Sequence, residues 1–428
     1  MRKALPESIV EELNVTRRGT SPVEHWRTFS ERDWTRCLRW LDYSGLAIYF
    51  LEKLSQSGRL NILPSPIRQD LEKRRANNSI RTEAILRELT RFTEAFKQAR
   101  VNYAILKGLA LVPDYCPDAA LRTQYDHDVL VDAASIDAAE RVLQNAGYRH
   151  KSGTRDGHCI VYRRPEPRIR FAHDTEGLYS PDLGRSIELH LNLWEDAEEK
   201  IYLNLPNDFL SRRKASSWKR WNFDGLCDED SLLFQILHAF KHILRNWCRL
   251  SIFLEIAMFL ERRASDAAFW DRFATRIQTV RWAPEASLVV LTLADQIFGV
   301  GMPPHLSHLL TTRRAPALGL WIEKYGRDAA VFNFHRDKCS LFLHREFIER
   351  DDDWTAIRRR RLFPIQRPHR PPAVVFQRGF STAGRLWLEN VHALKRLAFH
   401  SRAGLRYAFE YPRWLLWRRL ALAESRDT

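Results

Sequence analysis

Paired cysteines are missing from this chain of 428 residues, and their absence excludes two classes of protein. The six cysteines are scattered, without a Cys-x-x-Cys pair, at positions 37, 116, 159, 227, 248 and 339. This spacing argues against both a zinc site and a disulfide framework, and it fits a reducing compartment.

Long apolar runs are also missing. The most apolar run of the later chain, residues 251–260, is interrupted by Glu255 and is far shorter than the ~20 residues of a spanning helix. The N-terminal stretch MRKALPESIVEELNV mixes both charge signs before any apolar run develops, so it lacks the hydrophobic segment of a secretory signal. We therefore expect a cytoplasmic protein.

Acidic residues are scarce at the C-terminal end. From Trp354 onward, 16 Lys+Arg stand against 4 Asp+Glu, a net of +12 out of +15 for the whole chain. The segment begins with the run Arg358–Arg361 and continues with arginine interleaved with aromatic residues. Such a pattern fits a solvated basic helix pair packed on the body, a segment on an anionic membrane surface, or a nucleic-acid contact. The sequence leaves all three open, so attachment to the inner face of the membrane is an alternative localisation.

Four regions follow from the pattern of apolar residues. Residues 1–100 read as helical, with predicted helices over 33–55 and 67–99, and residues 226–353 return to helix. Residues 101–225 alternate strands with helices, and residues 354–428 form the basic segment. Within 101–225 we predict a helix over 135–146 and strands at 159–163, 168–172 and 186–193. The order predicts an α+β fold, in which a small mixed β-sheet core is flanked by N-terminal and C-terminal helical regions.

The stretch 103–131 is the candidate centre of the chemistry. An apolar run ends at Lys107-Gly108 and a second begins after Asp126-His127-Asp128, which predicts strand, glycine turn, helix and strand. Residues i and i+2 of a strand share a face, so Asp126 and Asp128 lie side by side and His127 points away. Because two adjacent carboxylates repel each other, the pair calls for a hard divalent cation such as Mg²⁺.

A third carboxylate is available on a later strand. Apolar and polar residues alternate from Ser186 to Leu193, which places Glu188, His190 and Asn192 on one face. Glu188 can therefore face the aspartate pair across a sheet.

These motifs resemble the nucleotidyltransferases of the DNA polymerase β-like superfamily. The similarity covers residues 86–260, and a weaker similarity is found at 362–364. It is strongest to a poorly characterised bacterial branch described as nucleotidyltransferase family proteins. The resemblance implies that Asp126 and Asp128 form a metal pair, that Glu188 is the third carboxylate, and that two Mg²⁺ ions are held there, with Mn²⁺ as the alternative. It also implies that Lys107, Gly108 and Leu109 form the turn that binds the phosphates.

Two positions depart from the pattern of that superfamily. Gly-Ser or Gly-Gly is usual at the turn, where this chain has Gly108-Leu109, so Lys107 takes the place of the missing hydroxyl. Aspartate is common where Glu188 stands, and the longer side chain shifts a ligand oxygen by about one methylene. Both departures keep the type of ligand.

Four further residues have open roles. Arg122 either contacts phosphate or acceptor, or pairs with the two aspartates. His238 and His242 lie four apart on one predicted helix face, a spacing that can bind metal, but no third ligand accompanies them. We expect them, with His190, to pack or to line the substrate.

The resemblance implies transfer of a nucleoside monophosphate from an NTP, ATP being favoured, to an acceptor hydroxyl, with release of pyrophosphate. The acceptor is a small molecule, a peptide or protein, or RNA. The alternative is a catalytically silent relative that binds nucleotide or a partner through the same fold.

Overall fold

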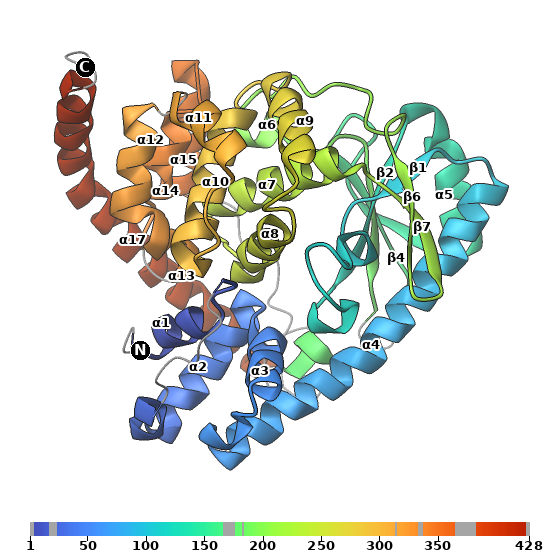
Figure 1. Cartoon of the computed structure of the whole chain (residues 1–428), viewed down its shortest axis with the longest axis horizontal. Helices are drawn as coiled ribbons and strands as arrows, with labels where there is room; N and C mark the ends of the chain where they lie inside the picture. Colours follow the sequence, from blue (N-terminus) through green and yellow to red (C-terminus); the bar gives the residue numbers. More distant parts are fainter. Residues whose placement is uncertain are drawn as a thin grey trace.

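The computed structural model describes residues 4–16, 24–165, 176–181, 184–312, 315–332, 337–363 and 382–424. Figure 1 shows a sheet on one side of the molecule and a large group of helices on the other, with the long helix α4 (Ser65–Gln98) running past the sheet. The predicted α+β fold with helical flanks is confirmed.

Three shorter helices precede α4, namely α1 (Ala4–Glu12), α2 (Glu31–Ser44) and α3 (Ala47–Gln56). Ser30 caps α2 by accepting a hydrogen bond from the backbone N–H of Asp33. Gly45 then ends this helix with φ of +74°, a conformation that side-chain-bearing residues rarely adopt. The single helix predicted over 33–55 is therefore wrong, because the chain breaks at Gly45. The helix predicted over 67–99 is α4.

Seven strands form one mixed sheet, in the order β3-β4-β5-β2-β1-β7-β6. The pairs β2/β5 and β1/β7 are parallel and the remaining pairs are antiparallel. The strand predicted at 159–163 is β4, and the one predicted at 186–193 ends earlier, at His190. The strand predicted at 168–172 lies outside the described residues. The bounds are β1 (Tyr103–Ile105), β2 (Asp126–Val131), β3 (Arg149–Ser152), β4 (Cys159–Arg163), β5 (Ser186–His190), β6 (Lys214–Trp218) and β7 (Trp221–Gly225).

The segment between β1 and β2 is not the predicted helix. Two short 3₁₀ turns lie there, η3 (Gly108–Leu111) and η4 (Ala119–Leu121). Pro113 and Pro117 explain the difference, because proline lacks the N–H that a helix interior requires. The helix predicted over 135–146 is α5 (Ile136–Asn145).

After β7, the regular elements of the described chain are helices joined by loops. In order they are α7 (Asp228–Leu244), α8 (Leu250–Arg262), α9 (Ala267–Gln278), α10 (Ala283–Phe298), α11 (Pro304–Thr312), α12 (Pro316–Trp321), α13 (Arg327–Val331), α14 (Ser340–Arg345), α15 (Asp351–Leu362) and α17 (Thr382–Glu424). A one-turn helix, α6 (Asp196–Glu199), precedes β6, and a π-helical turn, Ile322–Gly326, joins α12 to α13.

The sheet has an apolar core on each face. On β1, Tyr103 and Ile105 belong to the core shared with α4 and α5. Ala104 on β1, and Leu106 directly after it, belong to the core shared with the helices after β7. This alternation follows from the period of two along a strand. Polar residues that replace apolar ones on the second face are therefore held between the sheet and those helices.

A buried histidine in the helical part makes stability depend on pH. His344 on α14 is fully buried, and its Nε2–H donates to the Glu199 carbonyl over 2.7 Å. Burial lowers its pKa to about 3, while the unfolded chain keeps a pKa near 6.5. The unfolded state therefore binds more protons between these values, and we expect the free energy of unfolding to fall as pH drops from 6.5 toward 3, by up to about 1.4 kcal/mol per pH unit for this proton.

Urea unfolding at a series of pH values measures this dependence. His344→Gln keeps a hydrogen-bond donor but cannot titrate, so its stability curve should be shallower than that of the wild type over the same window. Parallel curves for the two proteins would show that His344 does not contribute.

Candidate active site

Two parallel strands bring three carboxylates together. In the pairing of β2 with β5, Asp128 lies opposite Glu188. The ligand oxygens of Asp126, Asp128 and Glu188 all lie within 4.8 Å of one another. The predicted trio is therefore assembled on one face of the sheet.

His127 points to the other face, as the alternation along β2 predicts. Its Nε2 lies 3.1 Å from a carboxylate oxygen of Glu88 on α4, and its ring makes an edge contact with Phe92 at 5.1 Å between centroids. These contacts attach β2 to α4 and leave the opposite face for the carboxylates.

Lys107 closes the cluster from the end of β1. Its Nζ lies 2.6 Å from Oδ1 of Asp128. Gly108 follows with φ of +66°, and a Cβ there would lie 2.4 Å from the Gln124 side chain. Only glycine fits this turn without displacing Gln124, so the turn directs Lys107 to the carboxylates.

The charges of the cluster are unequal. Burial would raise the pKa of Asp128, but Lys107 and His190 outweigh burial and hold that pKa well below its usual range. Burial and the neighbouring Asp128 raise the pKa of Asp126. Burial and both aspartates raise the pKa of Glu188 to about 7. One carboxylate is thus neutralised by a cation, and two are destabilised in the charged form.

His190 orients the inner aspartate. Its Nε2 lies 2.9 Å from Oδ1 of Asp128 and 3.9 Å from Oε2 of Glu188. Behind it lies His158, with ring centroids 5.0 Å apart, and the Nε2 of His158 is 3.7 Å from Glu195. Lys241 on α7 reaches the same carboxylate at 3.7 Å.

Sequence reasoning missed His158, Glu195 and Lys241. Each lies on a different segment, and no regular spacing connects them. The one available signal was the antiparallel pairing of β4 with β5, which places Cys159 opposite His190 and so brings the preceding residue, His158, to the site.

The donor set fits a hard divalent cation. Oδ2 of Asp128 is buried without a hydrogen-bond partner among the described residues. Asp128 has the lowest pKa of the three carboxyl groups, so it is ionised and this oxygen is available to a ligand. Carboxylate oxygens are the ligands that Mg²⁺ prefers. A second group, Cys159, Glu188 and His190, lies on the neighbouring strands β4 and β5 and offers softer donors, but it shares Glu188 with the first.

A third acidic group is accounted for by an arginine. This group is close enough together to hold one metal ion and consists of Glu195, Glu198 and Glu199. All three carboxylates pair with Arg245, whose Nη2 lies 3.0 Å from Oε2 of Glu198. This group therefore joins α6 to α7.

Arg122 is paired with neither aspartate. Its Nε lies 3.0 Å from both carboxylate oxygens of Glu255 on α8, whose side chain also accepts a hydrogen bond from Tyr49 over 3.0 Å. Arg122 still lies near enough to lower the pKa of Asp126 electrostatically. Its direct contact joins the loop before β2 to α8.

His238 and His242 contact each other through their Nε2 atoms, 2.8 Å apart. His242 also reaches the Trp247 carbonyl through Nδ1, and His238 stacks on Phe234 at 6.1 Å. Burial lowers both pKa values, that of His242 to about 3, and the charge of Lys107 adds to the shift. The pair is therefore neutral near pH 7, and its ring and hydrogen-bond contacts are with α7 itself and with the turn that follows it.

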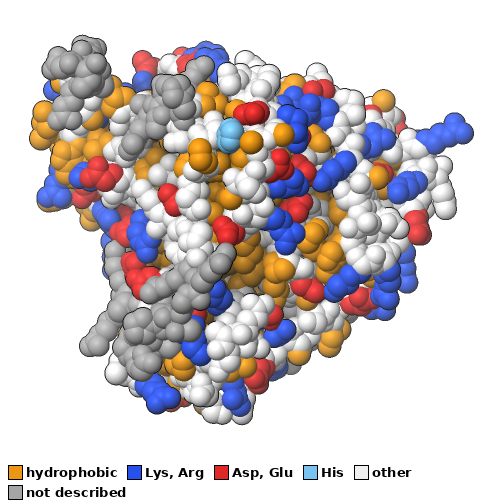
Figure 2. Space-filling view, in the orientation of Figure 1, with side chains coloured by type: hydrophobic (Ala, Val, Ile, Leu, Met, Phe, Trp, Pro, Cys, Tyr) orange, Lys and Arg blue, Asp and Glu red, His pale blue; other side chains and the backbone are white. Residues whose placement is uncertain are grey.

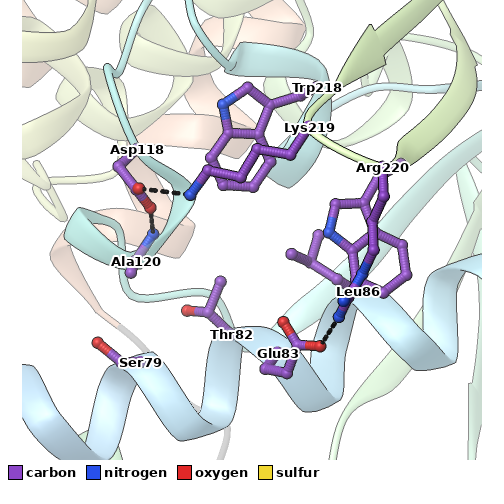
Figure 3. A pocket seen from close by; sticks show the side chains of 10 residues that line it. Ser79, Thr82, Glu83, Leu86, Asp118, Ala120, Trp218, Lys219 and Arg220 are labelled. Carbon is purple, nitrogen blue, oxygen red and sulfur yellow. Dashed lines mark hydrogen bonds and ion pairs between the residues drawn. The ribbon is translucent and has the colours of Figure 1, made fainter.

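A cavity of about 420 Å³ lies apart from the carboxylates, between α4 and the turn from β6 to β7. Figure 3 shows Trp218, Lys219 and Arg220 at its rim, facing α4. Lys219 is 3.0 Å from Asp118, and Arg220 pairs with Glu83. The side chains of Lys219 and Arg220 are 60% and 69% exposed, and none of the groups of described residues that could hold a metal lies at this cavity. The carboxylate cluster therefore remains the candidate active site.

Comparison with known proteins agrees with this geometry. A family model described as an uncharacterised nucleotidyltransferase matches residues 30–299, which include every residue of the carboxylate cluster. Searches of curated proteins and of solved structures gave no match. The match covers more than half of the chain, from α2 to the end of α10, and this chain is therefore a member of the uncharacterised nucleotidyltransferase family.

Proposed function

We propose that this enzyme transfers a nucleoside monophosphate from an NTP, with ATP favoured, to an acceptor hydroxyl and releases pyrophosphate in a metal-dependent reaction. The observation that carries the proposal is the trio Asp126, Asp128 and Glu188, with ligand oxygens within 4.8 Å of one another. The resemblance to the DNA polymerase β-like superfamily belongs to the same proposal.

Asp126, Asp128 and Glu188 would hold two Mg²⁺ ions, or Mn²⁺ in their place. When bound, the ions supply positive charge against the phosphates and the leaving pyrophosphate. The fit rests on the unpartnered Oδ2 of Asp128 and on the raised pKa values of Asp126 and Glu188, because a cation relieves the repulsion between these carboxylates.

Lys107 would bind phosphate. Its ammonium group is buried against Asp128, and its pKa is raised because that carboxylate outweighs burial, so it stays charged. A triphosphate at the cluster offers this ammonium a second anionic partner within reach of the same turn. Lys107 would thereby compensate for the missing hydroxyl at Leu109.

Glu188 would accept the proton of the acceptor hydroxyl. In the metal-free protein, burial beside two aspartates raises the pKa of Glu188 to about 7, and bound cations would lower that pKa and leave the carboxylate charged to accept the proton. His190 would keep Asp128 oriented as a ligand, and Glu188 would serve both as a ligand and as the proton acceptor.

One observation favours the alternative, a catalytically silent nucleotide-binding relative. The Lys107–Asp128 ion pair already neutralises the most buried carboxylate without a metal. Incubation with each NTP, with and without Mg²⁺ or Mn²⁺, and with cell extract as the source of acceptor, separates the two functions. Metal-dependent pyrophosphate release supports transfer, and NTP binding without release supports the silent relative.

Lys107→Ala should weaken NTP binding at least about tenfold, because it removes a charged contact to phosphate. His127→Gln is the matched control, since His127 lies in the neighbouring strand but contacts Glu88 on the opposite face. Nucleotide titration in the presence of Mg²⁺ measures both. Equal losses in the two variants would mean that the phosphates bind elsewhere.

A further inference from the structure

The helix α17 carries apolar side chains on two opposite faces. Its inner face packs on the body through Tyr407 and Trp414, each 3% exposed, and Trp414 stacks on Phe342 of α14 with ring centroids 5.3 Å apart. The outer face is unlike the rest of the surface. Of the fourteen large apolar side chains that are exposed among the described residues, nine lie on this helix.

Six of the nine form one line, which we call the outer stripe. Each is 54–73% exposed, and at 3.6 residues per turn all six fall within a sector of about 80°. The stripe runs along the helix for about 50 Å at 1.5 Å per residue. Its members are Trp387, Leu394, Leu405, Phe409, Leu416 and Leu420.

Cations accompany the outer stripe. Lys395, Arg402 and Arg419 are exposed within three positions of a stripe residue, and none has a carboxylate partner in the part of the chain that the structure describes. The helix as a whole carries eight Lys+Arg against three Asp+Glu. Glu410, one of the three, is turned to the inner face, where Tyr325 donates to it over 3.1 Å.

This combination selects one kind of partner. A second copy of the chain would bring like charges together along the same line, and RNA gains little from a row of exposed leucines. No helix among the described residues is long and apolar enough to cross a membrane. An apolar line with flanking cations is instead the pattern of a helix that lies in the interface of an anionic bilayer.

We infer that the outer stripe of α17 docks this enzyme on an anionic lipid surface. Figure 1 shows the C-terminal part of α17 extending past the neighbouring helices, and Figure 2 shows hydrophobic side chains gathered along that edge. The apolar side chains enter the acyl boundary, while Lys395, Arg402 and Arg419 meet the lipid phosphates. The inner face stays packed on α14, so the body is held beside the membrane.

Flotation of the full chain with vesicles tests the inference. We expect at least tenfold stronger binding to phosphatidylcholine vesicles with roughly 30 mol % phosphatidylglycerol than to pure phosphatidylcholine, and weaker binding as salt rises. Leu405→Gln, Phe409→Gln and Leu416→Gln together should lower this binding at least about tenfold, because they remove apolar side chains from the stripe. These positions are exposed, so circular dichroism and the melting temperature should be unchanged.

Two controls have matched chemistry elsewhere on the surface. Ile80→Gln with Trp247→Gln removes side chains that are 59% and 61% exposed outside α17 and should change binding less than about twofold. Binding to anionic vesicles should fall when the cations beside the stripe are neutralised by Lys395→Gln, Arg402→Gln and Arg419→Gln. It should not fall when three exposed cations outside α17 are neutralised in the same way, at Arg87, Arg149 and Lys151.

Three results would overturn the inference. The first is undiminished vesicle binding by the triple glutamine variant at the stripe. The second is salt-sensitive retention on RNA without any binding to vesicles. The third is a concentration-dependent dimer that the stripe variant abolishes while vesicles bind neither protein, which would make a second copy the occupant.

Discussion

Asp126→Asn is expected to lower metal-dependent pyrophosphate release by roughly 10²–10³-fold, the range seen when one preorganised electrostatic group is removed, while leaving the protein as stable as the wild type or more so. Burial and Asp128 raise the pKa of Asp126, so its charge is unfavourable in the metal-free protein. The neutral amide keeps the shape and removes the repulsion.

Asp128→Asn should lower metal-dependent pyrophosphate release to a similar extent, and it should also lower the free energy of unfolding. Its side chain is fully buried between Lys107 and His190, and the amide leaves the ammonium without its closest counterion. Breaking a buried ion pair costs about 3–5 kcal/mol, and the lower part of that range applies because Asp126 and Glu188 still attract Lys107.

Urea unfolding without divalent cations, paired with the pyrophosphate assay, separates the two substitutions. Asp137→Asn, at a side chain 63% exposed on α5, is the matched control and should change neither measurement. A strongly destabilised Asp126→Asn protein would contradict the model of repulsion and indicate a structural ion pair instead.

Arg122→Ala is expected to destabilise the fold by about 3–5 kcal/mol, because it leaves the carboxylate of Glu255 buried without its counterion. The side chains of Arg122 and Glu255 are 12% and 2% exposed, and among the described residues only the Tyr49 hydroxyl would remain as a hydrogen-bond partner of Glu255. Urea unfolding of the variant measures the loss.

The double variant Arg122→Met/Glu255→Met should recover most of this stability, since replacing both partners of a buried pair by apolar groups is often neutral. Arg155→Ala, which breaks an exposed ion pair to Asp137, is the matched control and should change stability little. If Arg122→Ala were stable but raised the KM for NTP, Arg122 would contact phosphate.

The carboxylate cluster could be predicted because its signals are local. Asp126 and Asp128 are two apart on a strand, so period two alone assigned them to one face. Glu188 lies in an alternating run, and the resemblance to a known superfamily indicated that it faces the pair. The parallel pairing of β2 with β5, in which Asp128 lies opposite Glu188, is set by the order of the seven strands and could not be read from either strand alone.

The partners of these residues could not be predicted, because they are set by packing between distant segments. Glu255 is 133 residues from Arg122, and Lys241 reaches Glu195 only because α7 packs across the sheet. The edge hairpin of β6 and β7 was missed for a related reason. Its sequence, from Lys214 to Gly225, carries charged, serine and tryptophan residues without a clear apolar alternation.

The parallel pairing of β1 with β7 has a consequence during synthesis. Ile105 pairs with Gly225, and the 120 residues from 106 to 225 take about 6–24 s to translate at 5–20 residues per second. β1 can pair with β2 early, but its other edge has unpaired N–H and C=O groups until β7 emerges, and such an edge can template pairing with another chain. During synthesis, β1 is therefore an exposed edge strand, although it is an interior strand of the finished sheet. Chaperones that shield exposed strands would act in that interval.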